Sequence, residues 1–447
     1  MIATKTDPAE RQRNTAREIF IRALEASTVA AAVARSVQCD GNQLSVADCT
    51  YDLTRFSEAC IISIGKAGAT LFDAIDALLP PTLRRRAIVS APTPPQKAGA
   101  NTLYFAGGHP EPNAASIEAA RAALHAVSTC ADDALVLFLI SGGASAMCEL
   151  PLSDAVTLED LILFNRFLIG SGASIAELNC VRKHLSRIKG GRLAAQAGTR
   201  EKITLLVSDV PDNALDALGS GPSLPDTSTV ADCHAIVARY ALHDRLPPSI
   251  QSLLSGDLEE SPKPGHPAFD NATASVLLGN STVLEQTERL AQQMGYEVHT
   301  DSTCDDWDYA AAAQHLVDQL ETLRRPGGKI CLLSGGEVTV RLPEAPGTGG
   351  RNLQFCLHCA ASELPAGTAI LSAGTDGIDG SSPAAGAVAD PTTRQRGEQK
   401  GMDIETYLHD FDAYNFFNPL GDTIITGPTG NNLRDVRILL WEDTPTN

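Results

Sequence analysis

The stretch LVLFLISGGASA, residues 135–146, decides the fold class. Its apolar run, Leu135 to Ile140, passes directly into the turn Ser141-Gly142-Gly143, and helical sequence follows. A short apolar run that ends in a glycine-rich turn predicts a strand buried on both faces, as in parallel sheets that helices cover. The stretch therefore predicts an α/β protein.

The same pattern of strand, turn and helix continues on both sides of this stretch. Further strands are expected at residues 60–64, 87–90, 103–105 and 203–207, and later at 275–278, 330–333, 369–371, 423–425 and 436–441. Between the two sets, residues 246–269 contain prolines and acidic residues with little periodicity, which is typical of a domain junction. The sequence thus predicts two α/β domains, residues 1–255 and 256–447.

The composition excludes several classes of protein. With 447 residues, 43% hydrophobic and 20% charged, the chain can form real cores, so it is neither disordered nor collagenous. No apolar run approaches the length of a membrane span, about 20 residues, and the polar N-terminus has no signal sequence. The net charge of −19 argues against a nucleic-acid partner. We expect a cytoplasmic protein with neither a membrane nor a nucleic acid as partner.

The cysteines also indicate a cytoplasmic protein. Their number, 11, is odd, and several lie inside apolar runs, as expected of reduced, buried thiols. Cys356 and Cys359 form a C-x-x-C pair, but no second pair completes a structural zinc site. The sequence leaves the role of this pair open.

Ligands of open α/β sheets bind beyond the carboxyl ends of the strands, and several unusual residues are expected there. Gly142 and Gly143 would let backbone amides approach an anion, or they serve the tight turn alone. Lys66 follows a strand and could neutralise a phosphoryl group or a carboxylate, unless it is simply solvated. Asp209 ends another strand and could bind a metal or accept a hydroxyl proton, unless it caps a turn.

Two candidates are expected in the second domain. Arg351 opens a helix after two glycines and could clamp a carboxylate or phosphate through two parallel hydrogen bonds. Asp376 and Asp379 lie in the sequence GTDGIDG, which suits either a cation-contacting loop or Asx turns. The sequence alone leaves both interpretations of these aspartates open.

A cluster of basic residues follows the capping box that Ser174 and Glu177 are expected to form. The predicted helix ends at Gly190-Gly191 and carries four basic side chains: Arg182, Lys183, Arg187 and Lys189. They form either a solvated face near the helix C-terminus or part of an anion site.

Several catalytic signatures are absent from the sequence. It contains no Walker A motif, no G-x-G-x-x-G fingerprint, no G-x-S-x-G elbow and no H-E-x-x-H. Glycine-rich strand ends with a lysine, an arginine and several aspartates suit phosphoryl transfer on a different fold.

Short stretches follow one another in a characteristic order along most of the chain. They are GKA at 65–67, GHPEP at 108–112, ISGGASA at 140–146, LNCVRKH at 178–184, IKGGR at 188–192, SDVP at 208–211, GSGP at 219–222, SGGE at 334–337, GGRN at 349–352, AGTDGIDG at 373–380 and TGPTGN at 426–431. In these stretches the chain resembles the class II glycerate 2-kinases, whose C-terminal half is called the MOFRL domain. Some members of that family are named hydroxypyruvate reductase. Ala144 departs from it, because the family often has a glycine there.

The resemblance implies a fold and an activity. It implies a larger, Rossmann-like N-terminal domain with a mainly parallel sheet, a C-terminal MOFRL domain and an active-site cleft between them. The implied reaction transfers the γ-phosphate of ATP to the 2-hydroxyl of D-glycerate with Mg²⁺, giving 2-phosphoglycerate and ADP. Two alternatives stay open: an NAD(P)H-dependent hydroxypyruvate reductase and a non-catalytic sugar-acid-binding sensor. A homodimer is compatible with the sequence.

The resemblance, together with the pattern of residues at the strand ends, also suggests roles for residues. Lys66, Asp209 and Arg351 would be catalytic, and Lys66, Arg351 and His109 would bind the substrate. Asp209 and Asp376 would bind the metal. The nucleotide phosphates would lie against two glycine-rich turns, which contribute Ser141, Gly142, Gly143, Ser145, Ser334, Gly335, Gly336 and Glu337.

Overall fold

The computed structural model describes residues 7–97 and 99–443 and divides the chain into two compact units. The middle unit comprises residues 29–277, and the terminal unit combines the residues up to 28 with those from 278 onward. This division differs from the expected boundary at residue 255, because the strand that follows the proline-containing segment still pairs with the first sheet. The helix before residue 28 packs on the second sheet.

The sheet of the middle unit has six strands in the order β6-β5-β4-β7-β8-β9. Their bounds are β4 (Glu58–Ile64), β5 (Arg84–Ser90), β6 (Thr102–Phe105), β7 (Leu135–Ser141), β8 (Lys202–Val207) and β9 (Ala272–Leu278). The pairs β6–β5, β5–β4, β4–β7 and β7–β8 are parallel. Every residue of β4, β7 and β8 is buried, which explains their uninterrupted apolar sequence. The expected parallel α/β sheet is confirmed, although the strand expected at 275–278 belongs here.

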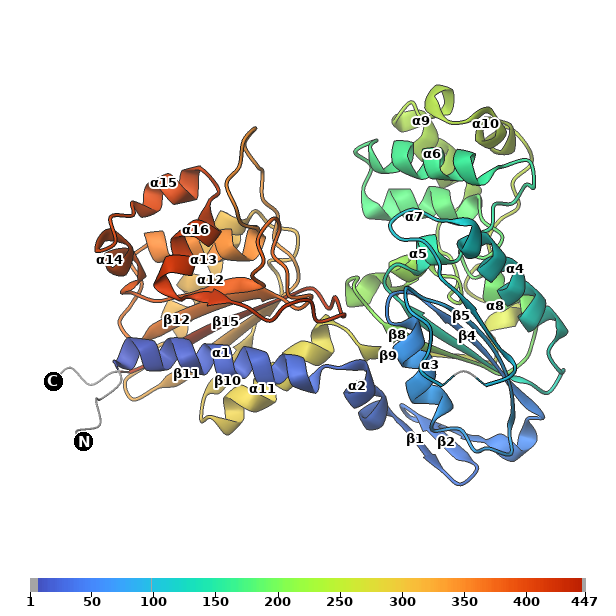
Figure 1. The fold of residues 1–447 in the computed structure, drawn as a ribbon, viewed down its shortest axis with the longest axis horizontal. Helices are drawn as coiled ribbons and strands as arrows, with labels where there is room; N and C mark the ends of the chain where they lie inside the picture. Colours follow the sequence, from blue (N-terminus) through green and yellow to red (C-terminus); the bar gives the residue numbers. More distant parts are fainter. Residues whose placement is uncertain (1–6, 98, 444–447) are drawn as a thin grey trace. The chain divides into compact units, whose positions relative to one another are not determined.

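Helices cover this sheet and form a separate bundle beside it. The helices of the unit are α2 (Val29–Ser36), α3 (Gly68–Asp76), α4 (Ala114–Thr129), α5 (Ala144–Met147), α6 (Leu158–Ile169), α7 (Ile175–His184), α8 (Arg192–Gln196), α9 (Val230–Arg239) and α10 (Pro248–Leu254). The bundle has a core of its own, made by α6, α7, α9 and α10, and Figure 1 shows it in green to one side of the sheet. A small antiparallel sheet of β1 (Val37–Asp40), β2 (Gln43–Val46) and β3 (Cys49–Asp52) was not expected from the sequence.

The helix that begins after Ser174 is shorter than expected. Its capping box is present, because Ser174 Oγ accepts from the Glu177 amide at 3.3 Å while the Glu177 carboxylate accepts from the Ser174 amide at 2.9 Å. However, α7 ends at His184, and Gly191, with φ of +79°, precedes α8. Lys189 therefore lies in the turn between two helices and not on the expected helix.

The sheet of the terminal unit is mixed. Its six strands follow the order β10-β11-β15-β12-β13-β14, and only β10–β11 is parallel among the pairings described. The bounds are β10 (Glu297–Thr300), β11 (Lys329–Gly335), β12 (Thr368–Gly374), β13 (Gly386–Ala389), β14 (Thr423–Ile424) and β15 (Asp435–Glu442). The last strand in the sequence, β15, thus lies between β11 and β12.

Helices cover both faces of this second sheet. They are α1 (Pro8–Ala26), α11 (Asn280–Gln293), α12 (Tyr309–Leu323), α13 (Arg351–Ala361), α14 (Thr393–Glu398), α15 (Ile404–His409) and α16 (Ala413–Phe417). Figure 1 shows α1 and α11 on one face and α12 to α16 on the other. No helix among the described residues is long and apolar enough to cross a membrane.

Buried ion pairs hold α1 against the second sheet. Arg13 pairs with the buried carboxylates of Asp390 and Asp422. Arg17 lies 3.3 Å from Asp422 Oδ1, and Arg396 donates to Asp422 Oδ2 at 2.6 Å. These contacts explain why the first helix belongs to the terminal unit, and a local reading of the sequence could not show them.

Removing one of these cations should destabilise the terminal unit. In Arg13→Met, the buried Asp390 loses its closest counter-charge and the buried Asp422 loses one of three neighbouring cations, and we expect a loss of about 3 kcal/mol. The control is Arg22→Met on the same helix. Arg22 pairs with Glu18, and the two side chains are about half exposed (45% and 56%). We expect that variant to change stability by at most about 0.5 kcal/mol. Calorimetric unfolding would contradict the assignment if the two variants lost the same stability.

Candidate functional site

Three neighbouring strands of the middle unit end beside one another. Lys66 follows β4, the turn at Gly142 and Gly143 follows β7, and Asp209 follows β8. Because β4, β7 and β8 are adjacent and parallel, their carboxyl ends meet at one edge of the sheet. The Lys66 amide donates to the Gly142 carbonyl at 2.8 Å, so the first two turns are in direct contact.

The two glycines allow the charged side chains to approach the turn closely. A Cβ on Gly142 would lie 2.2 Å from Asp209 Oδ2. A Cβ on Gly143 would lie 3.0 Å from His109 Cδ2 and 3.2 Å from Lys66 Cγ, and Gly143 also has a φ of +83°. The structure therefore brings together three of the candidate residues, Lys66, His109 and Asp209, around this turn.

The local electrostatics favour a single positive charge beside the turn. Lys66 is exposed, so its ammonium is open to a ligand. Partial burial of the ring and then the positive charge of Lys66 lower the pKa of His109. The imidazole is thus neutral near pH 7 and can donate or accept one hydrogen bond.

The turn also offers backbone donors. Within the described part of the chain, the amides of Ala144 and Ser145 donate no hydrogen bond. Amides that lack an acceptor at the start of a helical turn can donate hydrogen bonds to an anion. The turn at residues 141–146 therefore combines a lysine with two amides that have no acceptor among the described residues.

The four basic residues predicted as a cluster all bond to other residues of the protein. Lys183 donates to Asp216 and Asp226, and Lys189 pairs with Glu149. Arg182 donates to Asn165, and Arg187 donates to the Leu152 carbonyl and to Asp154. Both lysines are buried, so the solvated-face interpretation is wrong for them. The four residues do not present a common anion site.

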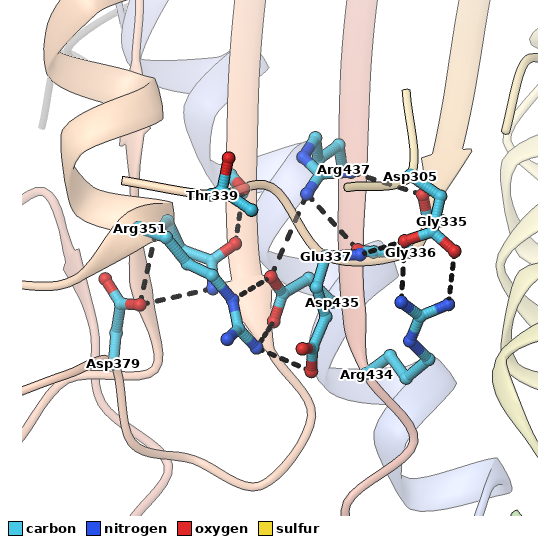
Figure 2. Close-up of polar contacts among 12 residues, drawn as sticks. Asp305, Gly335, Gly336, Glu337, Thr339, Arg351, Asp379, Arg434, Asp435 and Arg437 are labelled. Atoms are coloured by element: carbon cyan, nitrogen blue, oxygen red, sulfur yellow. Dashed lines mark hydrogen bonds and ion pairs between the residues drawn. The ribbon is translucent and has the colours of Figure 1, made fainter. Parts of the chain in front are cut away.

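The predicted arginine of the terminal unit is held by two carboxylates. Arg351 begins α13, and its Nε and Nη2 donate to the two oxygens of Asp435 at 2.6 and 3.0 Å. The same Nη2 lies 2.7 Å from Glu337 Oε1 (Figure 2). Asp435 thus occupies one edge of the guanidinium, and a ligand would have to use the edge that includes Nη1.

Within the terminal unit, Arg351 lies on a hollow of about 700 Å³. Charged residues and exposed aliphatic residues share its lining, which includes Glu337, Arg351, Asp376, Leu342 and Ile378. Burial, and the neighbouring Asp435, raise the pKa of Glu337. The hollow has room for a small organic ligand beside the arginine.

The turn at Ser334–Glu337 differs from the turn at 141–146. The amides of Gly336 and Glu337 donate to Asn280 Oδ1 and Asp305 Oδ1, each at 3.0 Å. On the other side, the buried Arg437 donates to the carbonyls of Gly335 and Gly336 at 3.2 Å (Figure 2). These internal partners leave the two amides unavailable to phosphate, although the two turns share the sequence Ser-Gly-Gly.

Both aspartates of the GTDGIDG sequence accept hydrogen bonds from backbone amides. Asp379 is buried, and its carboxylate accepts from the amides of Asn352 and Leu353 at 3.1 and 2.8 Å, so it caps α13. Burial raises its pKa to about 7. Asp376 Oδ1 accepts from the Ile378 amide at 3.1 Å, which is an Asx turn. Among the residues that the structure describes, no group of three or more metal-binding side chains occurs.

Cys356 and Cys359 lie on the buried face of α13. Burial raises the pKa of both thiols, and Cys356 Sγ donates to the Ala387 carbonyl at 3.2 Å. A buried thiol with a raised pKa is unreactive, so the pair has a packing role.

The sequence did not identify the partners of Arg351 and of the turn at residues 334–337. Asp435, Asp305 and Arg437 became apparent only in the structure. Each is up to about 100 residues away in the sequence from the group it contacts, and it lies on a different strand or loop. One signal was available: Asp435 and Arg437 flank a valine at the start of a predicted strand. Polar residues in an otherwise apolar, buried strand require partners.

Both units are thus α/β, and the middle unit carries a glycine-rich turn beside Lys66 and Asp209 at the carboxyl edge of its parallel sheet. Comparison with known proteins is consistent with this class. Residues 15–255 match a domain of unknown function, DUF4147, and residues 330–435 match the MOFRL family. The chain belongs to the glycerate 2-kinase family, in which these two domains occur together.

Three similar proteins illustrate the relationship. The D-glycerate 2-kinase of Thermotoga maritima is 33% identical, over 85% of this chain and 89% of that protein. A putative hydroxypyruvate reductase of Agrobacterium vitis is 35% identical, over 85% of this chain and 86% of its own length. The crystal structure of a Thermotoga maritima glycerate kinase matches with a TM-score of 0.82 and 31% identity, covering 97% of this chain and 100% of the other.

The close contact at Gly142 predicts the effect of a methyl group there. In Gly142→Ala the new Cβ would lie 2.2 Å from the Asp209 carboxylate, so this side chain must move. We expect a loss of about 1 kcal/mol of stability from this overpacking. A crystal structure of the variant should show the carboxylate displaced. Gly99→Ala is the control, because among the described residues, its chain neighbours apart, no atom lies within 4 Å of its added Cβ. If the Asp209 carboxylate keeps its position in that structure, the close contact between Asp209 and Gly142 is contradicted.

Proposed function

We propose that this protein is a glycerate 2-kinase that transfers the γ-phosphate of ATP to the 2-hydroxyl of D-glycerate. The observation that carries the proposal is the gathering of Lys66, His109 and Asp209 around the turn at Gly142 and Gly143. Relatives named glycerate 2-kinase and glycerate kinase support it. Phosphoryl transfer requires positioning and charge stabilisation, and this group of residues offers both.

The turn at residues 141–146 is proposed to bind the nucleotide phosphates. The amides of Ala144 and Ser145 donate to phosphate oxygens, and the absence of a side chain at Gly142 and Gly143 lets the phosphates approach. Lys66 neutralises the charge that develops on the transferred phosphoryl group. We leave the turn at Ser334–Glu337 out of this site, since its amides have internal acceptors.

Asp209 is proposed to act on the hydroxyl group of the acceptor. Its carboxylate lies against Gly142, next to the proposed phosphate site, where it can orient the 2-hydroxyl and accept its proton. His109, neutral near pH 7, contributes a hydrogen bond to the substrate.

Asp209 is also the proposed ligand for Mg²⁺. Mg²⁺ is usually held by one or two carboxylates with substrate phosphates and water, so a single aspartate beside a phosphate site fits this ion. When bound, the ion neutralises charge on the phosphates. Asp376 is the weaker candidate, because its Oδ1 is already used in a turn.

Arg351 is proposed to bind the carboxylate of glycerate. Asp435 and Glu337 fix the guanidinium from two directions, so it is held in a defined orientation at the hollow. A preorganised donor of this kind favours a small anion over water.

Product analysis tests the proposal directly. The purified protein is incubated with ATP, Mg²⁺ and each of D-glycerate, tartronate and a longer aldonate, and phosphorus NMR follows the products. We expect 2-phosphoglycerate from D-glycerate. A parallel reaction with NADH and hydroxypyruvate should show no loss of absorbance. Oxidation of NADH without any phosphorylated product would replace the kinase with a reductase.

Substitution of Asp209 separates its two proposed roles. In Asp209→Asn the side chain keeps its shape but loses the base, and we expect kcat to fall about 100-fold or more. A rise in the Mg²⁺ concentration required for half-maximal rate would indicate a metal ligand. An unchanged requirement would indicate action on the hydroxyl. Asp154→Asn, at an exposed ion pair with Arg187, is the control. Near-normal kcat in Asp209→Asn would remove this residue from the mechanism.

A further inference from the structure

A buried lysine lies beneath the turn that we propose binds phosphate. The side chain of Lys189 is 1% exposed, and its Nζ donates to the carbonyl of Ser145 at 2.8 Å. The same ammonium contacts the carboxylate of Glu149. Lys189 therefore reaches from the connection between α7 and α8 to the backbone of the turn itself. The predicted mechanism assigns it no role.

The position of this lysine is fixed by further hydrogen bonds. Glu149 Oε1 accepts from Ser186 Oγ at 2.6 Å and from the Leu150 amide at 2.8 Å. Ser186 Oγ in turn accepts from the amides of Ile188 and Lys189, each at 3.3 Å. Since every member of this buried network has a partner, the ammonium has little freedom to leave the Ser145 carbonyl.

The side chain of Ser145 is held as well as its carbonyl. Its Oγ lies 3.0 Å from Ser220 Oγ, and Ser220 donates to Asn179 Oδ1 at 2.9 Å. Ser220 keeps a φ of +60°, which is uncommon for a residue other than glycine and requires support from its surroundings. Ser145 is thus anchored at two atoms, both on the inner side of the turn.

We propose that Lys189 is a positioning residue for the phosphate-binding turn, an inference that rests on the proposed function. By holding the Ser145 carbonyl inward, Lys189 fixes the peptide that joins Ser145 to Ala146 and so restrains the backbone of Ser145 from its carboxyl side. This restraint in turn limits how far the preceding amides of Ala144 and Ser145 can turn away from a ligand. Lys189 touches no substrate. Its charge is balanced by Glu149, so it acts through geometry and not through attraction of the nucleotide.

The test compares two buried lysines. In Lys189→Met we expect KM for ATP to rise about 10- to 100-fold, because small misplacements of binding groups are costly. KM for D-glycerate should stay within about 2-fold of its original value if the acceptor is held by other groups. The matched control is Lys202→Met. Lys202 is equally buried, but its Nζ donates to the Arg200 carbonyl at 2.6 Å, at the amino end of β8.

A milder variant keeps the inference testable if Lys189→Met does not fold. Ser186→Ala removes one hydroxyl that donates to Glu149 and leaves the lysine in place. We expect it to raise KM for ATP about 3-fold, with kcat changed less. A folded Lys189→Met with an unchanged KM for ATP would overturn the inference. An equal rise in Lys202→Met would also overturn it, since the effect would then come from the fold in general.

Calorimetric titration with ATP separates this inference from the proposed function. A wild-type protein that binds ATP but does not phosphorylate glycerate would contradict the proposed function alone. A Lys189→Met protein that binds ATP as tightly as the wild type would contradict the positioning role alone.

Discussion

Parallel pairing of β4, β7 and β8 is the constraint on which the candidate site depends. Parallel neighbours must end at the same edge of a sheet, so the strand pairing brings together three residues that are far apart in the sequence: Lys66, Gly142 and Asp209. The hydrogen-bond ladder brings them there, and the apolar sequence of the strands maintains it. The glycines then set how closely the side chains approach.

The sequence could predict those parts of the molecule that local pattern determines. Buried strands are apolar runs, so their positions were correct within a few residues, and residues at strand ends, such as Lys66 and Asp209, followed from them. The contacts that join distant segments of the chain were not predictable. The insertion of β15 between β11 and β12, the docking of α1 and the pairing of Arg351 with Asp435 depend on contacts that no periodicity records. The interpretation of the basic cluster as a solvated face failed for its two lysines for the same reason. The carboxylates that pair with these lysines lie on other elements.

The placement of the basic residues bears on how an acidic protein would present the proposed anion site. Although the net charge is −19, several lysines and arginines are buried against carboxylates, among them Lys183, Lys189, Arg13 and Arg437. These cations stabilise the interior and hold loops, and they do not attract ligands. Lys66 differs, because it is exposed at the rim of the sheet beside available amides. A single accessible cation in the right place gives more selectivity than a diffuse basic patch would.

The arrangement of the terminal unit affects how the chain folds during synthesis. The middle unit, residues 29–277, is complete before any strand of the second sheet has been made. Helix α1 emerges first, yet the sheet on which it packs contains β15, which emerges last among the strands. The carboxylates that pair with its arginines, Asp390 and Asp422, are also made late in the chain. The helix therefore waits through the translation of most of the chain with an amphipathic surface uncovered, a period in which chaperones or neighbouring chains have access to it.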